Sequence, residues 1–354
     1  MGVESVRRER GAAVATIGDV ARAAGVSRST VSYALSGKRA ISEETRERIA
    51  RAIEALGFTP NAGARALATS RTMVIGLFVQ FFPDEFPPAM LQYVLPISDA
   101  AREAGYDILM VTDEDGPGSL QRVTDSGMVD GVILLNVGHD DPRVAPLRAA
   151  RQPGALVGLP KDTEGLDVFD LDFGEAARSV IDHLHGLGHE EIVLISPHEH
   201  VIARGGAYVW RFREAALERA GRYGMRIHAS YGESQQPAVA AALHSILDAS
   251  PAATALVVHN DAMIAGLPLV LAARGVRVPD ELSVVGVYSE EFGRVFSLPY
   301  TAVETAPDVL GRAAVGALVQ RMRDPESAGA PVVGFVEPKL VDRRSTSRGR
   351  SRGH

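Results

Sequence analysis

Residues 16–37 read Thr-Ile-Gly-Asp-Val-Ala-Arg-Ala-Ala-Gly-Val-Ser-Arg-Ser-Thr-Val-Ser-Tyr-Ala-Leu-Ser-Gly, and they predict two short helices joined by a tight turn. In the first half, apolar residues recur at three- and four-residue spacing, as they do on one face of a helix. Gly25 allows the backbone conformation that the turn needs. Ser27 is placed to cap the second helix. The stretch therefore predicts a helix-turn-helix.

The second predicted helix has a polar outer face. It buries Val31, and it leaves four side chains that can form hydrogen bonds on the outside: Arg28, Ser29, Ser32 and Tyr33. A short helix of this kind, held against a supporting helix, is the shape that the major groove of DNA accepts.

A third helix is predicted over residues 43–56. Ser42 is placed to cap its start, and Gly57 is typical of the residue that ends a helix. The apolar residues recur at helical spacing and are expected to face the other two helices. They are Ile49, Ala52, Ile53 and Leu56.

These segments resemble the headpiece and hinge of the LacI/GalR family of transcription regulators. The resemblance rests on Thr16–Leu35, on Ile41-Ser42 with Thr45-Arg46, and on the segment from Gly57 to Leu67, and weaker matches continue to Ser345-Thr346. It implies three parts in this order: a disordered N-terminal arm over residues 1–15, a DNA-binding headpiece over 16–60, and a hinge helix or linker over 61–72.

The outward-facing residues of these parts are candidates for contacts with DNA. Arg28, Ser29 and Tyr33 would read base edges, and an arginine can pair with guanine through two hydrogen bonds. Phosphate contacts, which position the protein on the duplex, are expected from Thr16, Ser27, Ser32 and Asn61. By resemblance to the family's hinge, Leu67 would be a wedge in the minor groove that bends the duplex. The predicted surface also includes Thr30 and Arg65.

The charge of the chain is divided unevenly. Residues 1–72 hold 12 Lys and Arg against 7 Asp and Glu, whereas the remaining 282 residues hold 25 against 37, within a net charge of -7. A basic head on an acidic body suits a protein whose head alone approaches phosphate.

From residue 73 the pattern changes to short apolar runs that alternate with amphipathic helices. Examples are a strand at 74–79, a helix at 87–104 and a strand at 107–111, and a second series starts near Asp172. This alternation predicts an α/β fold with parallel sheets. The body resembles the family's effector domain, which is built like a periplasmic sugar-binding protein. We therefore expect a two-lobed domain with doubly wound parallel sheets over residues 73–342, followed by a flexible basic tail over 343–354.

The carboxyl ends of the predicted strands are where open α/β sheets bind ligands. These ends carry aromatic side chains beside amides and carboxylates, a combination that suits a sugar and equally a nucleoside. The candidates at these ends are Phe81, Phe82, Asp113 and Tyr288.

The resemblance adds two further residues to the predicted ligand site. It implies that Asp261 contacts the effector and that an arginine before a Gly-aromatic pair does so as well. Arg204 is our choice for this arginine, with Arg211 as the alternative. The family often has two Asp residues after the late strand, where this chain reads Tyr288-Ser289. The missing Asp pair and the uncertain position of the arginine both depart from the family pattern, and both argue against a standard hexose effector.

The resemblance also implies how the protein would work. A small-molecule effector, sugar-like by the residues above, would bind between the lobes and change the spacing of two hinges across the twofold axis of a homodimer. Two heads would require a palindromic operator in double-stranded DNA. The chain has no terminal leucine heptad, so we expect a dimer rather than a tetramer. The sequence leaves open whether the effector releases DNA or recruits it.

Two other classes of protein share features with this sequence. The first is an enzyme, but the chain has no cysteine and no phosphate-binding loop, and its histidines lack the spacing of a zinc site. We therefore expect no catalytic residue, metal or cofactor. The second is a solute-binding protein, which the body alone would fit. We find no apolar run long enough for a membrane span and no export signal, and so predict a cytoplasmic protein.

Overall fold

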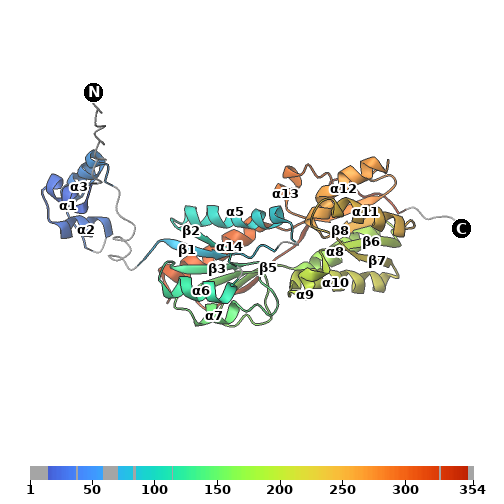
Figure 1. Ribbon diagram of the computed structural model, residues 1–354, viewed down its shortest axis with the longest axis horizontal. Helices are drawn as coiled ribbons and strands as arrows, with labels where there is room; N and C mark the ends of the chain where they lie inside the picture. The colour runs from blue at the N-terminus through green and yellow to red at the C-terminus, as the bar shows by residue number, and fades with distance from the viewer. Residues whose placement is uncertain are drawn as a thin grey trace, which may run out of the picture. The chain divides into compact units, whose positions relative to one another are not determined.

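The computed structural model describes residues 15–36, 39–58, 71–82, 85–113, 115–326 and 328–349. The chain divides into two compact units, residues 1–73 and 74–354, which are treated separately below. Figure 1 shows the helical unit and the larger α/β unit. Among the described residues, no helix has the length and apolar character to cross a bilayer.

The first unit is a bundle of short helices, which confirms the predicted helix-turn-helix. Its described helices are α1 (Ile17–Ala24), α2 (Arg28–Ser36) and α3 (Glu43–Leu56). Gly25 and Gly57 take the left-handed conformation and end α1 and α3. The core between the helices contains Val20, Ala21, Ala24, Val31, Ile49, Ala52 and Phe58. Leu56, expected to face inward, is 40% exposed, so that expectation is wrong.

The second unit consists of two lobes, each built on a sheet that has six strands in the described residues. The elements of lobe 1 are β1 (Val74–Phe78), α5 (Pro87–Glu103), β2 (Asp107–Val111), α6 (Gly116–Asp125), β3 (Gly131–Leu135), α7 (Val144–Ala149), β4 (Gly154–Val157), β5 (Asp167–Leu171), α14 (Pro307–Arg323) and β11 (Val333–Val336). The sheet order is β11-β5-β4-β3-β1-β2, and the strands pair in parallel.

Lobe 2 is formed by the middle of the chain and by its C-terminal part. Its elements are α8 (Phe173–Gly186), β6 (Glu191–Ser196), α9 (Glu199–Ala203), α10 (Ala207–Tyr223), β7 (Arg226–Tyr231), α11 (Ala238–Ala249), β8 (Ala255–Val258), α12 (Asp261–Ala273), β9 (Ser283–Val287), α13 (Glu290–Val295), β10 (Thr301–Glu304) and β12 (Lys339–Val341). The sheet order is β12-β10-β9-β8-β6-β7, with only β12 antiparallel among these pairs.

Strand β5 was not predicted, because its sequence Asp-Val-Phe-Asp-Leu has two carboxylates in a buried strand. Both carboxylates are held by distant arginines. Arg321 of α14 forms two hydrogen bonds with Asp167, and Arg211 of α10 pairs with Asp170. A buried charge is tolerated when it is paired in this way, so β5 can occupy the sheet.

Residues 343–349 were expected to belong to a flexible tail, but the structure docks them onto lobe 2. The Ser345 hydroxyl donates to the Val284 carbonyl at 2.6 Å and accepts from the Thr301 amide at 2.7 Å. His189 Nε2 lies 3.0 Å from the Ser347 carbonyl. Ser345 is only 3% exposed, so this segment is part of the folded lobe; residues 350–354 lie outside the described residues.

Candidate DNA-binding and ligand-binding sites

The start of α1 is closed by a reciprocal pair of hydrogen bonds. The Thr16 amide donates to Asp19 Oδ2 at 2.8 Å, and the Asp19 amide donates to Thr16 Oγ1 at 3.4 Å. Hydrogen bonds from Thr16 lower the pKa of Asp19 to about 2, and Arg22 adds to the effect. Thr16 therefore has a structural task as a cap, in addition to its predicted contact with phosphate.

The start of α2 carries a cluster of hydroxyl groups. Ser27 Oγ accepts from the Thr30 amide at 3.1 Å, which confirms the predicted cap, and it lies 2.7 Å from Ser29 Oγ and 2.8 Å from Thr30 Oγ1. Because the amides at a helix start point outward, such an end favours phosphate. The structure thus places the hydroxyl groups of Ser27, Ser29 and Thr30 together.

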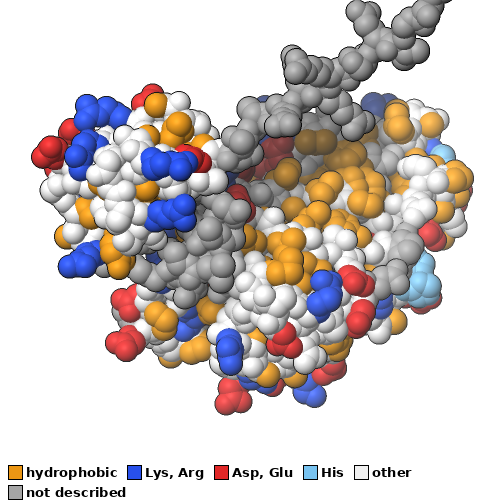
Figure 2. All heavy atoms as spheres, turned by 60° about the vertical axis from the view of Figure 1, so that its left-hand side comes forward, with side chains coloured by type: hydrophobic (Ala, Val, Ile, Leu, Met, Phe, Trp, Pro, Cys, Tyr) orange, Lys and Arg blue, Asp and Glu red, His pale blue; other side chains and the backbone are white. Residues whose placement is uncertain are grey.

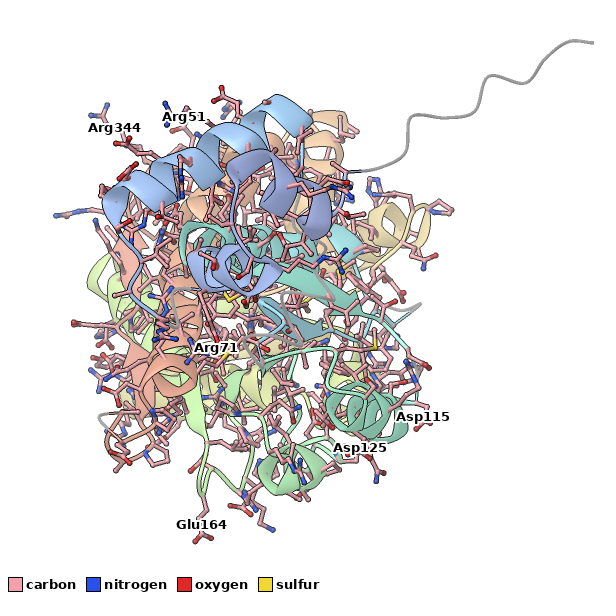
Figure 3. All side chains as sticks on the ribbon, turned by 90° about the vertical axis from the view of Figure 1, so that its left-hand side faces the viewer. Arg51, Arg71, Asp115, Asp125, Glu164 and Arg344 are labelled. Atoms are coloured by element: carbon pink, nitrogen blue, oxygen red, sulfur yellow. The ribbon has the colours of Figure 1, made fainter. Side chains whose placement is uncertain are left out.

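The remaining predicted DNA contacts of α2 lie on its accessible side. Arg28 is exposed, Ser32 is half-buried and Tyr33 is 37% exposed. Figure 2 shows Lys and Arg side chains over the surface of this unit, and Figure 3 shows Arg51 pointing away from α3. The other predicted contacts, Asn61, Arg65 and Leu67, lie outside the described residues.

A cavity lies between the lobes of the second unit, with about 830 Å³ of space when the solvent at its open mouth is included. Residues from both lobes line it, among them Gln92, Tyr93, Asn136, Asp170, Phe173, Tyr208, Arg211, His259, Asp261 and Thr305. A second cavity of about 550 Å³ is lined by Phe81 and Phe82 and shares Asn136, Tyr208 and Asp261 with the first. The two cavities therefore adjoin.

Asp170 and Arg211 form a buried ion pair on the cavity wall. Asp170 belongs to β5 of lobe 1 and Arg211 to α10 of lobe 2, and their side chains are 8% and 16% exposed. Burial raises the pKa of Asp170, and the Arg211 guanidinium opposes that rise. The Arg211 guanidinium also lies 5.5 Å from the centre of the Phe173 ring. Of the two arginines considered from the sequence, Arg211 is the one that lines the cavity.

Asp261 is the first residue of α12 and lines both cavities. The cap Asn260 orients this turn by accepting a hydrogen bond from the Met263 amide at 2.9 Å. Burial raises the pKa of Asp261 to about 7, although a hydrogen bond from Gln92 works against the rise. Near neutral pH its carboxyl group can therefore donate a hydrogen bond as well as accept one.

His259 presents a neutral imidazole to the cavity. Burial lowers its pKa to about 3, and its ring stacks on Phe173 with 5.6 Å between the ring centres. His259 Nδ1 and Gln92 Oε1 are both buried and have no hydrogen-bond partner among the described residues. An unpaired buried polar atom is costly, so both atoms are natural positions for a ligand's hydrogen bonds.

Arg204, the arginine chosen from the sequence, does not line either cavity. Its guanidinium is 3.1 Å from the Glu85 carboxylate and 4.1 Å from the centre of the Phe82 ring. Asn136 donates to the same carboxylate at 3.2 Å. Glu85 and Phe82 come from lobe 1 and Arg204 from lobe 2, so these contacts join the lobes beside the second cavity.

Two further predicted ligand contacts need correction, because, like Arg204, neither residue lines the two cavities. Tyr288 is fully buried beneath β9, and its hydroxyl donates to the Tyr300 carbonyl at 2.6 Å. Asp113 is exposed, and its carboxylate accepts from Ser119 Oγ at 2.7 Å and from the Asp115 amide at 3.0 Å. Figure 3 shows the neighbouring Asp115 on the outer surface.

Sequence reasoning missed several residues of the cavity wall. Three of them could have been found by the rule of strand ends. Asp170 lies near the end of β5, and His259 and Thr305 directly follow β8 and β10. Gln92, Tyr93 and Tyr208 lie on helices, and no local signal marks them.

Comparison with known proteins agrees with this architecture. Residues 16–61 match the family model "Bacterial regulatory proteins, lacI family", and residues 181–346 match a periplasmic binding protein-like domain. The HTH-type transcriptional regulator CelR of Thermobifida fusca is 31% identical over 341 residues, which cover 93% of this chain and 98% of CelR. The repressor PurR of Yersinia pestis is 27% identical over 95% of this chain and 98% of its own.

Solved structures show the same fold. A complex of CelR with cellobiose has a TM-score of 0.63 at 29% identity, and the match covers 94% of this chain and 99% of that one. A lac repressor dimer bound to operator and an anti-inducer has a TM-score of 0.77 at 23% identity, with the same coverage.

The helix-turn-helix unit and the two-lobed binding unit together define a DNA-binding transcriptional regulator controlled by a small molecule. The chain belongs to the LacI family. A solute-binding protein is not favoured, since such a protein needs no helix-turn-helix.

Proposed function

We propose that this regulator is a repressor whose affinity for a palindromic operator is switched by an uncharged, sugar-like ligand held between the lobes. The main support for this proposal is the composition of the cavity wall. It combines aromatic faces with buried polar atoms that have no partner among the described residues, among them His259 Nδ1 and Gln92 Oε1. A sugar offers apolar ring faces and a fringe of hydroxyls that would satisfy both features.

The charges of the wall favour an uncharged ligand. Arg211 balances Asp170. His259 is neutral because burial holds its pKa at about 3, and Asp261 is close to half-protonated at pH 7 because its pKa is about 7. A strongly charged ligand would leave an uncompensated charge in this buried space.

The adjoining cavities favour a ligand of more than one ring. The first cavity carries the polar wall, and the second adds the faces of Phe81 and Phe82. The crystallised CelR complex contains cellobiose, a disaccharide. A nucleoside or purine is the second candidate, because the Phe173, Tyr208 and His259 rings would also stack on a base and because relatives include purine repressors.

Thermal shift of the purified protein against disaccharides, monosaccharides, nucleosides and purine bases separates these ligands. We expect a disaccharide to raise the melting temperature most, because its two rings can occupy both cavities without adding charge. A larger shift with a purine base than with any sugar would assign the site to the second candidate.

The DNA-binding surface that we propose contains Thr16, Ser27, Arg28, Ser29, Thr30, Ser32 and Tyr33 of the headpiece and Asn61, Arg65 and Leu67 of the hinge. The hydroxyl cluster at the start of α2 and the exposed Arg28 support this assignment. A mobility-shift selection from genomic fragments tests it, with a fragment of residues 71–354 as the control. Equal operator binding by that fragment would contradict the proposal.

We propose that the protein acts as a homodimer through an apolar side of the second unit. Leu95 of α5 is 63% exposed, and Leu269 of α12 is 79% exposed. Figure 1 shows α5, α12 and α13 along one side of this unit, and Figure 2 shows exposed apolar side chains gathered on it. A second copy would cover them, as the lac repressor forms a dimer on its operator. Leu95→Glu with Leu269→Glu should convert the dimer to a monomer in sedimentation velocity.

No enzymatic activity is part of this proposal, because every feature of the cavity is explained by binding. A bacterial repressor acts on chromosomal DNA, so we place the protein in the cytoplasm. Fractionation of cells that express it would test that location.

A further inference from the structure

Gly18 is the second residue of α1, and the backbone conformation at this position does not require a glycine. Its φ is not positive, unlike that of Gly25, so any residue could adopt its conformation. Glycine is nevertheless among the worst helix formers, and alanine would favour the helix. Gly18 is also buried, although it has no side chain to bury. The residue that covers Gly18 explains why glycine occupies this position.

The guanidinium of Arg28 lies directly against Gly18. A Cβ on residue 18 would lie 2.8 Å from Nη2, 3.0 Å from Nε and 3.1 Å from Cζ of Arg28. Real Cβ atoms do not approach other atoms at 2.8 Å, so any other residue at position 18 would displace the guanidinium. The missing side chain thus forms a notch in α1, and Arg28 of α2 occupies it.

Arg28 is otherwise unrestrained. Its side chain is exposed, and among the described residues it forms no hydrogen bond or ion pair. All five N–H donors of its guanidinium therefore remain available for DNA. A flexible arginine loses rotamer freedom when it binds a base, and that loss is smaller when packing has already limited its positions.

We propose that Gly18 is a positioning residue for sequence reading: its lack of a side chain sets the position from which Arg28 reaches the operator. The inference rests on the proposed role of Arg28 in reading a base. Gly18 acts through Arg28 and does not itself supply a recognition group. The fold of the headpiece does not depend on it, since Arg28 is a flexible side chain that can move aside.

The test is a binding selection from a random DNA library, performed with the full-length wild type and with Gly18→Ala, Arg28→Ala and the double variant. Gly221→Ala is the matched control, because Gly221 is also a helical glycine and a Cβ there would meet nothing within 4 Å. Melting temperatures of all variants are measured in parallel.

We expect Gly18→Ala to lower the preference for the best base by about five- to hundredfold at one position of each half-site, the range of one well-placed arginine–base pair. Its melting temperature should be equal to or above that of the wild type. In the Arg28→Ala background, the same substitution should change nothing further. Gly221→Ala should retain the wild-type preference.

Three results would overturn the inference. One is a wild-type base preference in Gly18→Ala. Another is an effect of equal size in the absence of the Arg28 side chain, which would show that Gly18 acts independently of it. The third is a marked fall in melting temperature, which would assign Gly18 a structural role. Failure of the wild type itself to enrich any sequence would instead refute the proposed function.

Discussion

Asp170 of β5 and Arg211 of α10 form an ion pair that joins the two lobes in the wall of the ligand cavity. Both side chains are largely buried, so each depends on the other to offset the loss of water around its charge. The pair therefore serves two purposes. It stabilises this arrangement of the lobes, and it presents a polar, balanced surface to the ligand.

Arg211→Met should destabilise the protein by about 3 kcal/mol, because it leaves the Asp170 charge buried without a partner. Urea unfolding followed by circular dichroism measures the change. Arg219→Met is the matched control on the same helix. Its partner Asp182 is 41% exposed, so the loss should be much smaller than for Arg211→Met. Equal losses for the two variants would contradict the buried placement of the first pair.

Asp261 should make stability depend on pH. Its pKa in the folded protein is about 7, above the ordinary value of 3.8, so the native state holds a proton that the unfolded chain releases between these values. Stability from this residue is therefore fully present below about pH 4 and is lost as pH rises through 7. The free energy of unfolding of the wild type, minus that of Asp261→Asn, should therefore decrease as the pH rises from about 4 to above 7. A difference that is constant from pH 4 to 8 would refute it.

Tyr288→Phe should affect stability and leave ligand binding intact. The substitution removes the hydrogen bond from the buried hydroxyl to the Tyr300 carbonyl, which contributes about 1 kcal/mol. Calorimetry of the ligand found by the thermal-shift screen should give an unchanged affinity. A loss of affinity without a loss of stability would return Tyr288 to the ligand site.

Ser345→Ala should show that the C-terminal segment is part of lobe 2. It removes a hydroxyl that bonds both the Val284 carbonyl and the Thr301 amide in the interior. Leaving these backbone groups unpaired should cost about 2 kcal/mol, measured by urea unfolding. Ser245→Ala, at an exposed position of α11, serves as the comparison and should not lower stability.

Operator affinity should fall steeply with salt. Each phosphate contact contributes a slope of about 0.9 in a plot of log affinity against log salt concentration. Arg28→Ala should change base preference with little change in this slope, whereas loss of a phosphate contact would reduce it. A salt-independent affinity, measured by fluorescence anisotropy, would contradict binding by the basic headpiece.

The cavity residues show why only part of the site could be predicted. Phe81, Phe82 and Asp261 line the cavities as expected, since they follow or begin elements at the carboxyl ends of strands. Tyr288 follows β9 by the same rule, yet it turns into the core and bonds Tyr300. The direction of a residue after a strand depends on what packs around it, and the sequence near it does not contain that information.

The sequence alone determined the headpiece. Thr16, Ser27 and Ser42 cap helices, Gly25 and Gly57 end them, and α3 spans the predicted residues 43–56. Each of these signals acts within about four residues, so the local sequence is enough to predict it. Only the tertiary structure decided the buried strand β5 and the docked segment 343–349. Their polar groups are satisfied by partners such as Arg211, Arg321 and Val284, 41, 154 and 61 positions away. The free energy of burying a polar group depends on such distant partners, and the fold alone brings them together.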